Sequence, residues 1–515
     1  MNRLQEALEP NEDAYALWLA LVTDFNNEDD RFHLAVNRDV VGELLMQAGR
    51  LDDADQARRE AQKIWIELVA EFNHEDHRVQ MALNQDALAE VDRRAGRLAE
   101  AAAGYRCAID HWEKLAVDFP RQLRYAANQI DRLVRLSQVL RQLDRYEEVE
   151  QAYRQVLKIG QQVAAESPAD AWYARVPAAA RYYLGDLLLE SNRLESARQV
   201  YTVAIENYER LMQDFPDYAI LPGEFLHAVS GLATVLVRKH RPEDVGPLFE
   251  RAHNNLAGRA EKASDTREYQ TALSQIPFEC NNVAWQLATS ADVALRDGHR
   301  AVDLARRAIE LAPQEPSFWK TLGTALYRSG DRRTAIETLK IADELMLGQA
   351  FSHDAFFIAM AHWQVGDADA ARKWYVAAAR WMEKGDPKNE ELVRIRAEAA
   401  ALVGISEPAA ARGESPSDDR QLLGLVLEAW PDAAWPSIAR GRIHQTLGKR
   451  DEAEADIHRA VEAYTRLIEL QPEFSALRVQ RAGSGARGGH RVNRARRAGG
   501  ARAQHEGGKE SWLKR

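Results

Sequence analysis

Two 24-residue stretches decide the fold: GRLDDADQARREAQKIWIELVAEF at residues 49–72 and GRLAEAAAGYRCAIDHWEKLAVDF at residues 96–119. Each begins with Gly-Arg-Leu, places an alanine five positions after its glycine, and ends in a phenylalanine seven positions after a tryptophan. The second stretch follows the first at a step of 47 residues. A fixed step of this length is typical of repeat architectures, so internal periodicity sets the expected fold rather than chain length.

The same spacing continues along the chain. A small residue recurs at steps of 47, 48, 48 and 48 residues, at Ala54, Ala101, Val149, Ala197 and Val245. Aromatic residues recur with it, and we interpret them as core: Tyr105, Tyr153, Tyr201 and Phe249; Trp18, Trp65 and Trp112; Phe25, Phe72 and Phe119. A second set of repeats has a shorter step, since Trp285 and Trp319 are 34 residues apart.

Each unit predicts two helices joined by a tight turn. In one long unit, helix A spans residues 32–48 and Gly49 supplies the left-handed residue that ends it. Asp52 or Asp53 can then cap helix B, which runs to Phe72. Because no single pair can bury its own apolar side, neighbouring pairs must stack. The sequence therefore predicts an all-α fold, an α-α superhelix of stacked antiparallel helix pairs.

The shorter units resemble the tetratricopeptide repeat (TPR) family. The residues at the family's positions are Trp285, Ala301, Ala305, Ala308 and Pro313, then Trp319, Leu322, Gly323, Ala335, Leu339 and Ala342. The resemblance is closest over residues 281–381 and extends, in longer units, over residues 32–256. It implies a non-catalytic scaffold that holds a protein or peptide partner in a concave groove lined by helix A.

The family's groove positions predict which residues contact that partner. In the long units they are Asp39, Glu43, Asp86, Glu90, Arg94, Gln138, Arg141, Tyr182 and Asp186. In the short units they are Lys320, Thr324, Tyr327, Met360 and Trp363.

Three segments, 281–285, 327–331 and 359–363, also resemble the TPR region attached to bacterial serine/threonine protein kinases. In that group a kinase domain precedes the repeats. The alternative hypothesis is therefore the regulatory portion of such a kinase, with the catalytic domain missing from this chain. The sequence itself contains neither His-Arg-Asp nor Asp-Phe-Gly, so it encodes no kinase active site.

Changes in composition predict five segments. They are a long-unit array at 1–260 with a truncated first unit, a short-unit array at 261–404, a linker at 405–420, a further helix pair at 421–476 and a disordered basic tail at 477–515. The tail has 11 Lys/Arg and 2 Asp/Glu, whereas the whole chain has a net charge of −11. An acidic body does not suit nucleic acid, which we do not expect as a partner. The tail is either a basic arm that binds nucleic acid or acidic partners, or the product of a shifted reading frame.

No residue pattern predicts catalysis, a cofactor, a metal or a small-molecule substrate. His74 and His77 are spaced like metal ligands, but we interpret them as part of a solvated loop. Cys107 and Cys280 are the only cysteines, which fits a reducing, cytoplasmic compartment. No stretch approaches the roughly 20 apolar residues of a transmembrane helix.

Overall fold

The computed structural model describes residues 2–405 and 419–470, and within these ranges every regular element is a helix. Successive helices pack against one another in chain order. The predicted all-α fold of stacked helix pairs is confirmed. The chain forms two compact units: unit 1 is Met1–Lys239 with Glu250–Leu273, and unit 2 is His240–Phe249 with Ser274–Arg515.

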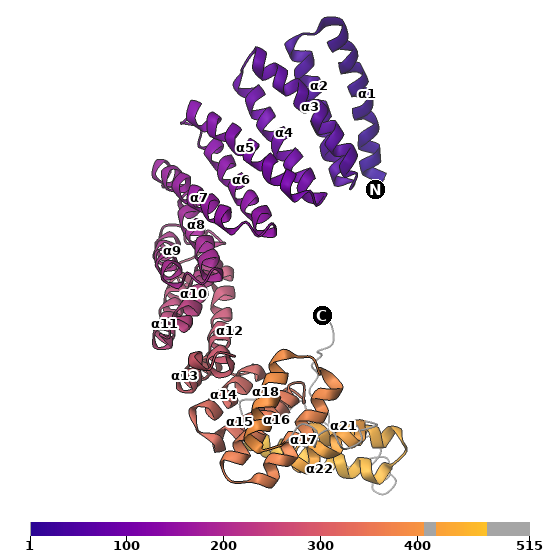
Figure 1. Ribbon diagram of the computed structural model, residues 1–515, viewed down its shortest axis with the longest axis vertical. Coiled ribbons are helices and arrows are strands. Elements are labelled where there is room, and N and C mark those ends of the chain that lie inside the picture. The colour runs from indigo at the N-terminus through magenta and orange to yellow at the C-terminus, as the bar shows by residue number, and fades with distance from the viewer. Residues whose placement is uncertain (1, 406–418, 471–515) are drawn as a thin grey trace, which may run out of the picture. The chain divides into compact units, whose positions relative to one another are not determined.

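Unit 1 is a row of antiparallel helices, and Figure 1 shows α1 to α6 side by side. In chain order its helices are α1 (Asn2–Phe25), α2 (Glu28–Gln47), α3 (Leu51–Glu71), α4 (Glu75–Arg94), α5 (Leu98–Asp118), α6 (Leu123–Gln142), α7 (Tyr146–Glu166), α8 (Ala171–Glu190), α9 (Leu194–Asp214) and α10 (Leu221–Arg238). After the short 3₁₀ helix η1 (Pro242–Asp244), two helices have residues in both units: α11 (Val245–Ala260) and α12 (Arg267–Thr289).

Unit 2 continues with helices that are mostly shorter, although α22 has 21 residues. In chain order they are η2 (Val293–Leu295), α13 (Gly298–Leu311), α14 (Pro316–Ser329), α15 (Arg332–Leu345), α16 (Phe351–Gln364), α17 (Ala368–Gly385), α18 (Glu390–Val403), α20 (Asp419–Ala429), α21 (Ala434–Thr446) and α22 (Arg450–Leu470). None of the helices in the described ranges is long and apolar enough to cross a bilayer. The predicted tail at 477–515 lies outside the described residues, as does most of the predicted linker.

The turn inside a pair depends on one residue in the left-handed region. Gly49 adopts a φ of +77°, so the predicted end of helix A is confirmed. Asn192 takes the same place in a later pair with a φ of +54°, a conformation that short polar side chains tolerate. The predicted cap at Asp52 or Asp53 is wrong, because α3 begins at Leu51 and leaves both aspartates in its first turn.

The aromatic columns form much of the core of unit 1. Trp65, Trp112 and Tyr201 expose at most 1% of their surface, and Tyr153 exposes 4%. Phe25 is an exception, since it exposes 68% of its surface. Its interpretation as a core residue is therefore wrong.

A buried carboxylate fastens α21 to α15 in unit 2. Glu344 has no exposed surface, and it accepts hydrogen bonds from the backbone N–H groups of Ala434 and Trp435, the latter at 2.9 Å. Asp343 accepts from Trp435 Nε1 at 2.8 Å. The first N–H groups of a helix have no partner within it. Glu344 therefore caps a helix that begins 90 residues later in the chain.

We expect unit 2 to lose stability between about pH 5 and about pH 8. Burial raises the pKa of Glu344 to about 8 and that of Asp354, in α16, to about 7. Both values lie above the roughly 4 of an unfolded carboxyl, so the folded state holds protons that the unfolded state releases. This stability is complete below the unfolded pKa and is lost as the pH rises through the folded values.

Chemical unfolding followed by tryptophan fluorescence at several pH values measures this loss. Glu344→Gln should weaken the pH dependence, whereas Glu337→Gln, at an exposed position of the same helix, should leave it unchanged. The same pH dependence in all three proteins would contradict the assignment.

Candidate functional site

Asp39, a predicted groove residue, joins three helices of unit 1. Its carboxylate accepts from Trp65 Nε1 of α3 at 2.8 Å and from Asn84 Nδ2 of α4 at 2.7 Å. The guanidinium of Arg58, also in α3, donates to it at 3.0 Å. A tryptophan buried in a core needs an acceptor for its indole N–H, and Asp39 provides one.

The same arrangement recurs one repeat later. Asp86 accepts from Trp112 Nε1 of α5 at 3.1 Å and from Arg132 Nε of α6 at 2.6 Å. In both repeats the tryptophan follows its aspartate by 26 residues. Asp86 exposes only 8% of its surface, and burial raises its pKa to about 6 although Arg132 favours the charged form. The two aspartates therefore hold neighbouring helix pairs together, and their carboxylates are already bonded within the chain.

The other predicted acids of helix A are bonded within the chain too. Each accepts from a helix B side chain 15 residues later: Glu43 from Arg58, Glu90 from Tyr105, and Asp186 from Tyr201. These pairs span the two helices of one hairpin. The helix A acids thus stabilise the repeat itself, a role that family positions alone did not reveal.

The remaining predicted residues of the long units are more accessible. Gln138 and Arg94 are exposed, although Arg94 pairs with Glu90 at 2.8 Å. Arg141 is half-buried and pairs with Glu190 across two repeats. Tyr182 is half-buried too, with its ring stacked 6.0 Å from that of His227 between centroids. That these side chains contact a partner stays a prediction.

In unit 2 the chain covers its own groove side. Helix α18 packs against α16, and its Glu398 pairs with Arg328 of α14. Thr324 and Met360 expose no surface, and Tyr327 exposes 7%. A partner cannot reach the first two side chains in this conformation, so we correct their assignment as contact residues.

Two predicted residues of unit 2 keep some exposure. Lys320 is half-buried, with its Nζ 4.4 Å from the centroid of the Trp285 ring, and Trp363 is half-buried at the end of α16. The structure brings Lys320 to an aromatic face rather than to an anion site. Whether either residue touches a partner stays a prediction.

An open groove lies elsewhere in unit 1, between α5 and α7, with α6 as its floor. Its volume is about 650 Å³, within the roughly 300–1,000 Å³ of ligand sites. Apolar side chains of α6, Leu133, Leu136 and Leu140, form part of the floor. Its walls α5 and α7 are helices B of adjacent repeats and its floor is a helix A, but none of the helix A residues that the sequence predicted as partner contacts lines it.

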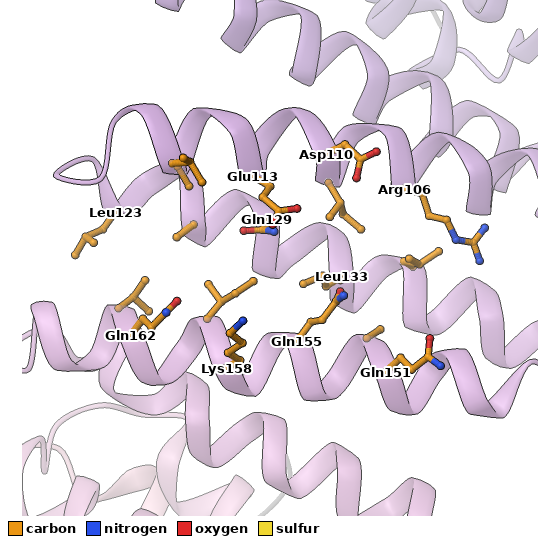
Figure 2. Close-up of a pocket in the computed structure, with 18 of the residues that line it drawn as sticks. Arg106, Asp110, Glu113, Leu123, Gln129, Leu133, Gln151, Gln155, Lys158 and Gln162 are labelled. Carbon is orange, nitrogen blue, oxygen red and sulfur yellow. The ribbon is translucent and has the colours of Figure 1, made fainter.

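Figure 2 shows the two walls of this groove. Arg106, Asp110 and Glu113 stand along α5, and Gln151, Gln155, Lys158 and Gln162 stand along α7, with their side chains directed toward the space between the helices. The four α7 positions follow the spacing i, i+4, i+7 and i+11, which places them on one face of a helix. This polar row was the signal in the sequence that could have revealed the groove.

The chain matches the sequence model of the tetratricopeptide repeat over residues 130–161. That stretch is similar to a tetratricopeptide repeat. It contains most of α6 and α7, and therefore part of the floor and most of one wall of the groove. The predicted resemblance to kinase-attached repeats stays a prediction.

Three solved structures resemble the chain in part. BtubC (BKLC) from P. vanneervenii is 18% identical and aligns 50% of this chain with 91% of its own, with a TM-score of 0.35. The RpL4 assembly chaperone Acl4 (residues 1–338) is 16% identical and aligns 55% of this chain with 99% of its own, with a TM-score of 0.33. The apo form of RapI is 12% identical and aligns 76% of this chain with 99% of its own, with a TM-score of 0.38. Comparison with curated protein sequences finds no match. Likeness at this level assigns no function.

We expect Asp86→Ala to destabilise unit 1 by about 3–5 kcal/mol, the cost of removing one partner of a buried ion pair. The substitution removes the acceptor of the Trp112 indole N–H and that of Arg132 Nε. Equilibrium urea unfolding measures the change. Asp110→Ala, at an exposed position of α5, should cost less than about 0.5 kcal/mol. Equal stability of the two variants would show that Asp86 is not a structural residue.

Proposed function

We propose that the chain is a non-catalytic scaffold and that the α5–α7 groove binds an extended segment of a partner protein. The observation that carries this proposal is the row of amide side chains, Gln151, Gln155 and Gln162, beside an apolar floor. The tetratricopeptide repeat at residues 130–161 supports it, because stacked helical repeats build extended binding surfaces.

The polar walls favour an extended segment over a helix. A helix has already satisfied its backbone groups and seeks apolar surface, whereas an extended strand brings unpaired N–H and C=O groups. A glutamine amide donates and accepts, so it can bond both kinds of group. From Gln151 to Gln162 the α7 wall spans roughly 16 Å, at about 1.5 Å per residue. That length fits about five residues of extended chain, at roughly 3.3 Å each.

The charges around the groove favour a basic segment. Four acids line it, Asp110, Glu113, Glu148 and Glu166, against two basic residues, Arg106 and Lys158. Arg106 and Glu148 neutralise one another at 2.7 Å. Lysine or arginine in the partner would therefore complement the remaining acids, with an attraction that weakens as salt is added.

The kinase-linked signalling role stays the second hypothesis, together with the cytoplasmic location. It rests on the residues at 281–285, 327–331 and 359–363, all in unit 2. The groove of unit 1 would bind a protein segment under either hypothesis.

Panning a phage-displayed library of random heptapeptides against the full chain tests the proposal. Enriched peptides should carry basic residues, and fluorescence polarisation should show their affinity for the chain. Gln155→Arg, at an exposed position of the α7 wall, should weaken that binding at least tenfold by placing a long cation in the groove.

The matched control is Gln138→Arg, an exposed glutamine on α6 that belongs to the predicted helix A surface. It should leave peptide affinity unchanged. Loss of binding in Gln138→Arg with normal binding in Gln155→Arg would move the site to helix A, against our proposal. Failure to enrich any peptide would also contradict it.

A further inference from the structure

Three side chains from two neighbouring repeats meet at one end of unit 1. Glu28 is the first residue of α2, His74 is the residue before α4, and His77 lies in the first turn of α4. Glu28 Oε1 lies 2.9 Å from His74 Nδ1 and 3.3 Å from His77 Nε2. One ligand atom of each residue lies within 4.8 Å of the other two. The interpretation of both histidines as solvated is wrong for His77, which exposes only 4% of its surface.

We propose that Glu28, His74 and His77 bind a divalent transition-metal ion, with Zn²⁺ as the best fit. Two imidazole nitrogens and one carboxylate oxygen form a donor set that Zn²⁺ accepts, whereas Mg²⁺ and Ca²⁺ prefer oxygen alone. Ligand bonds of about 2.1 Å in a tetrahedral site separate the donor atoms by roughly 3.4 Å. The two contacts of Glu28 are already close to that separation.

The next repeat contains the same carboxylate without the metal ligands. Glu75 stands 47 residues after Glu28, and the positions of His74 and His77 are taken by Arg121 and Arg124. Glu75 accepts from Gln122 Nε2 at 2.7 Å, from Arg124 at 3.3 Å, and from the hydroxyl of Tyr125. A guanidinium is a permanent cation with no lone pair to offer, so that site is closed to a metal ion. In the first repeat, by contrast, the carboxylate of Glu28 lies beside His74 and His77, whose imidazole nitrogens have lone pairs.

The surroundings suit a cation. Acidic residues fill the first turns of α2 and α4: Glu28, Asp29 and Asp30, then Glu75 and Asp76. The nearest arginines in those helices are neutralised, since Arg31 pairs with Glu71 at 2.6 Å and Arg78 pairs with Asp118 at 2.6 Å. The local charge therefore attracts a divalent ion.

One histidine is fixed and the other is adjustable. The rings of Phe32, Trp65 and Phe72 surround His77, with centroids 5.7, 6.5 and 6.2 Å from its own. The side chain of His74 is 60% exposed, so it can turn toward the ion and leave one coordination position to water. A bound ion would join the first turn of α2 to that of α4, and so link two adjacent helix pairs.

Isothermal titration of the tag-free, EDTA-treated full chain with Zn²⁺ tests the site. We expect one Zn²⁺ per chain, and at least tenfold weaker binding in both His74→Ala and Glu28→Gln. His227→Ala, which removes an exposed histidine elsewhere, serves as the control and should bind as the wild type does. Co²⁺ in place of Zn²⁺ should give the visible absorption of a tetrahedral site, and His74→Ala should lose it.

Absence of Zn²⁺ binding by the wild type would overturn the proposal. So would unchanged affinity in His74→Ala or Glu28→Gln, because other histidines would then account for the uptake. Neither His74 nor Glu28 is fully buried, so both variants should fold, which circular dichroism confirms.

Discussion

The structure depends on one constraint: a single helix pair cannot cover its own apolar side, so each pair needs the next. Trp65 and Trp112 show how the constraint is met, since both are buried within their repeats. A buried tryptophan adds a second demand, because its N–H must be bonded. Asp39 and Asp86 meet it and also bond Asn84 or Arg132 on the next helix A. The apolar stacking and the polar junctions thus stabilise the same interface.

This coupling determines which faces are available for binding. In unit 1, many acidic side chains of helix A are hydrogen-bonded to side chains of helix B. In unit 2, helix α18 packs against α16, a helix A on which groove residues were predicted. The α5–α7 groove differs because many of the polar side chains of its walls, such as Gln151 and Gln155, are exposed. Its apolar floor and amide wall are the basis for the proposed peptide site, and much of both lies in the stretch that matches the tetratricopeptide repeat.

The fold could be predicted from the sequence because the residues that recur at a fixed step are mostly those buried between the helices. The step of 47 residues located the tryptophans, and Gly49 located the turn. The site could not be predicted in the same way. A repeated aspartate gives the same sequence pattern whether it contacts a partner protein or bonds an indole N–H within the chain. Only the register of helix A against helix B decides that Asp39 reaches Trp65. Likewise, Glu28 and His77 are 49 residues apart, and only the stacking of repeats brings them together. Helix α18 was missed as a cover because its packing against α16 is a tertiary contact that no repeat column records.

The most direct test of the stacking requirement compares two fragments of unit 1 by circular dichroism and thermal unfolding. One holds the single pair α4–α5 (residues 75–118), and the other holds three pairs, α2–α7 (residues 28–166). We expect the single pair to be largely unfolded, whereas the three-pair fragment should be helical and unfold cooperatively. A single pair with the same helicity per residue and the same cooperative transition would contradict it.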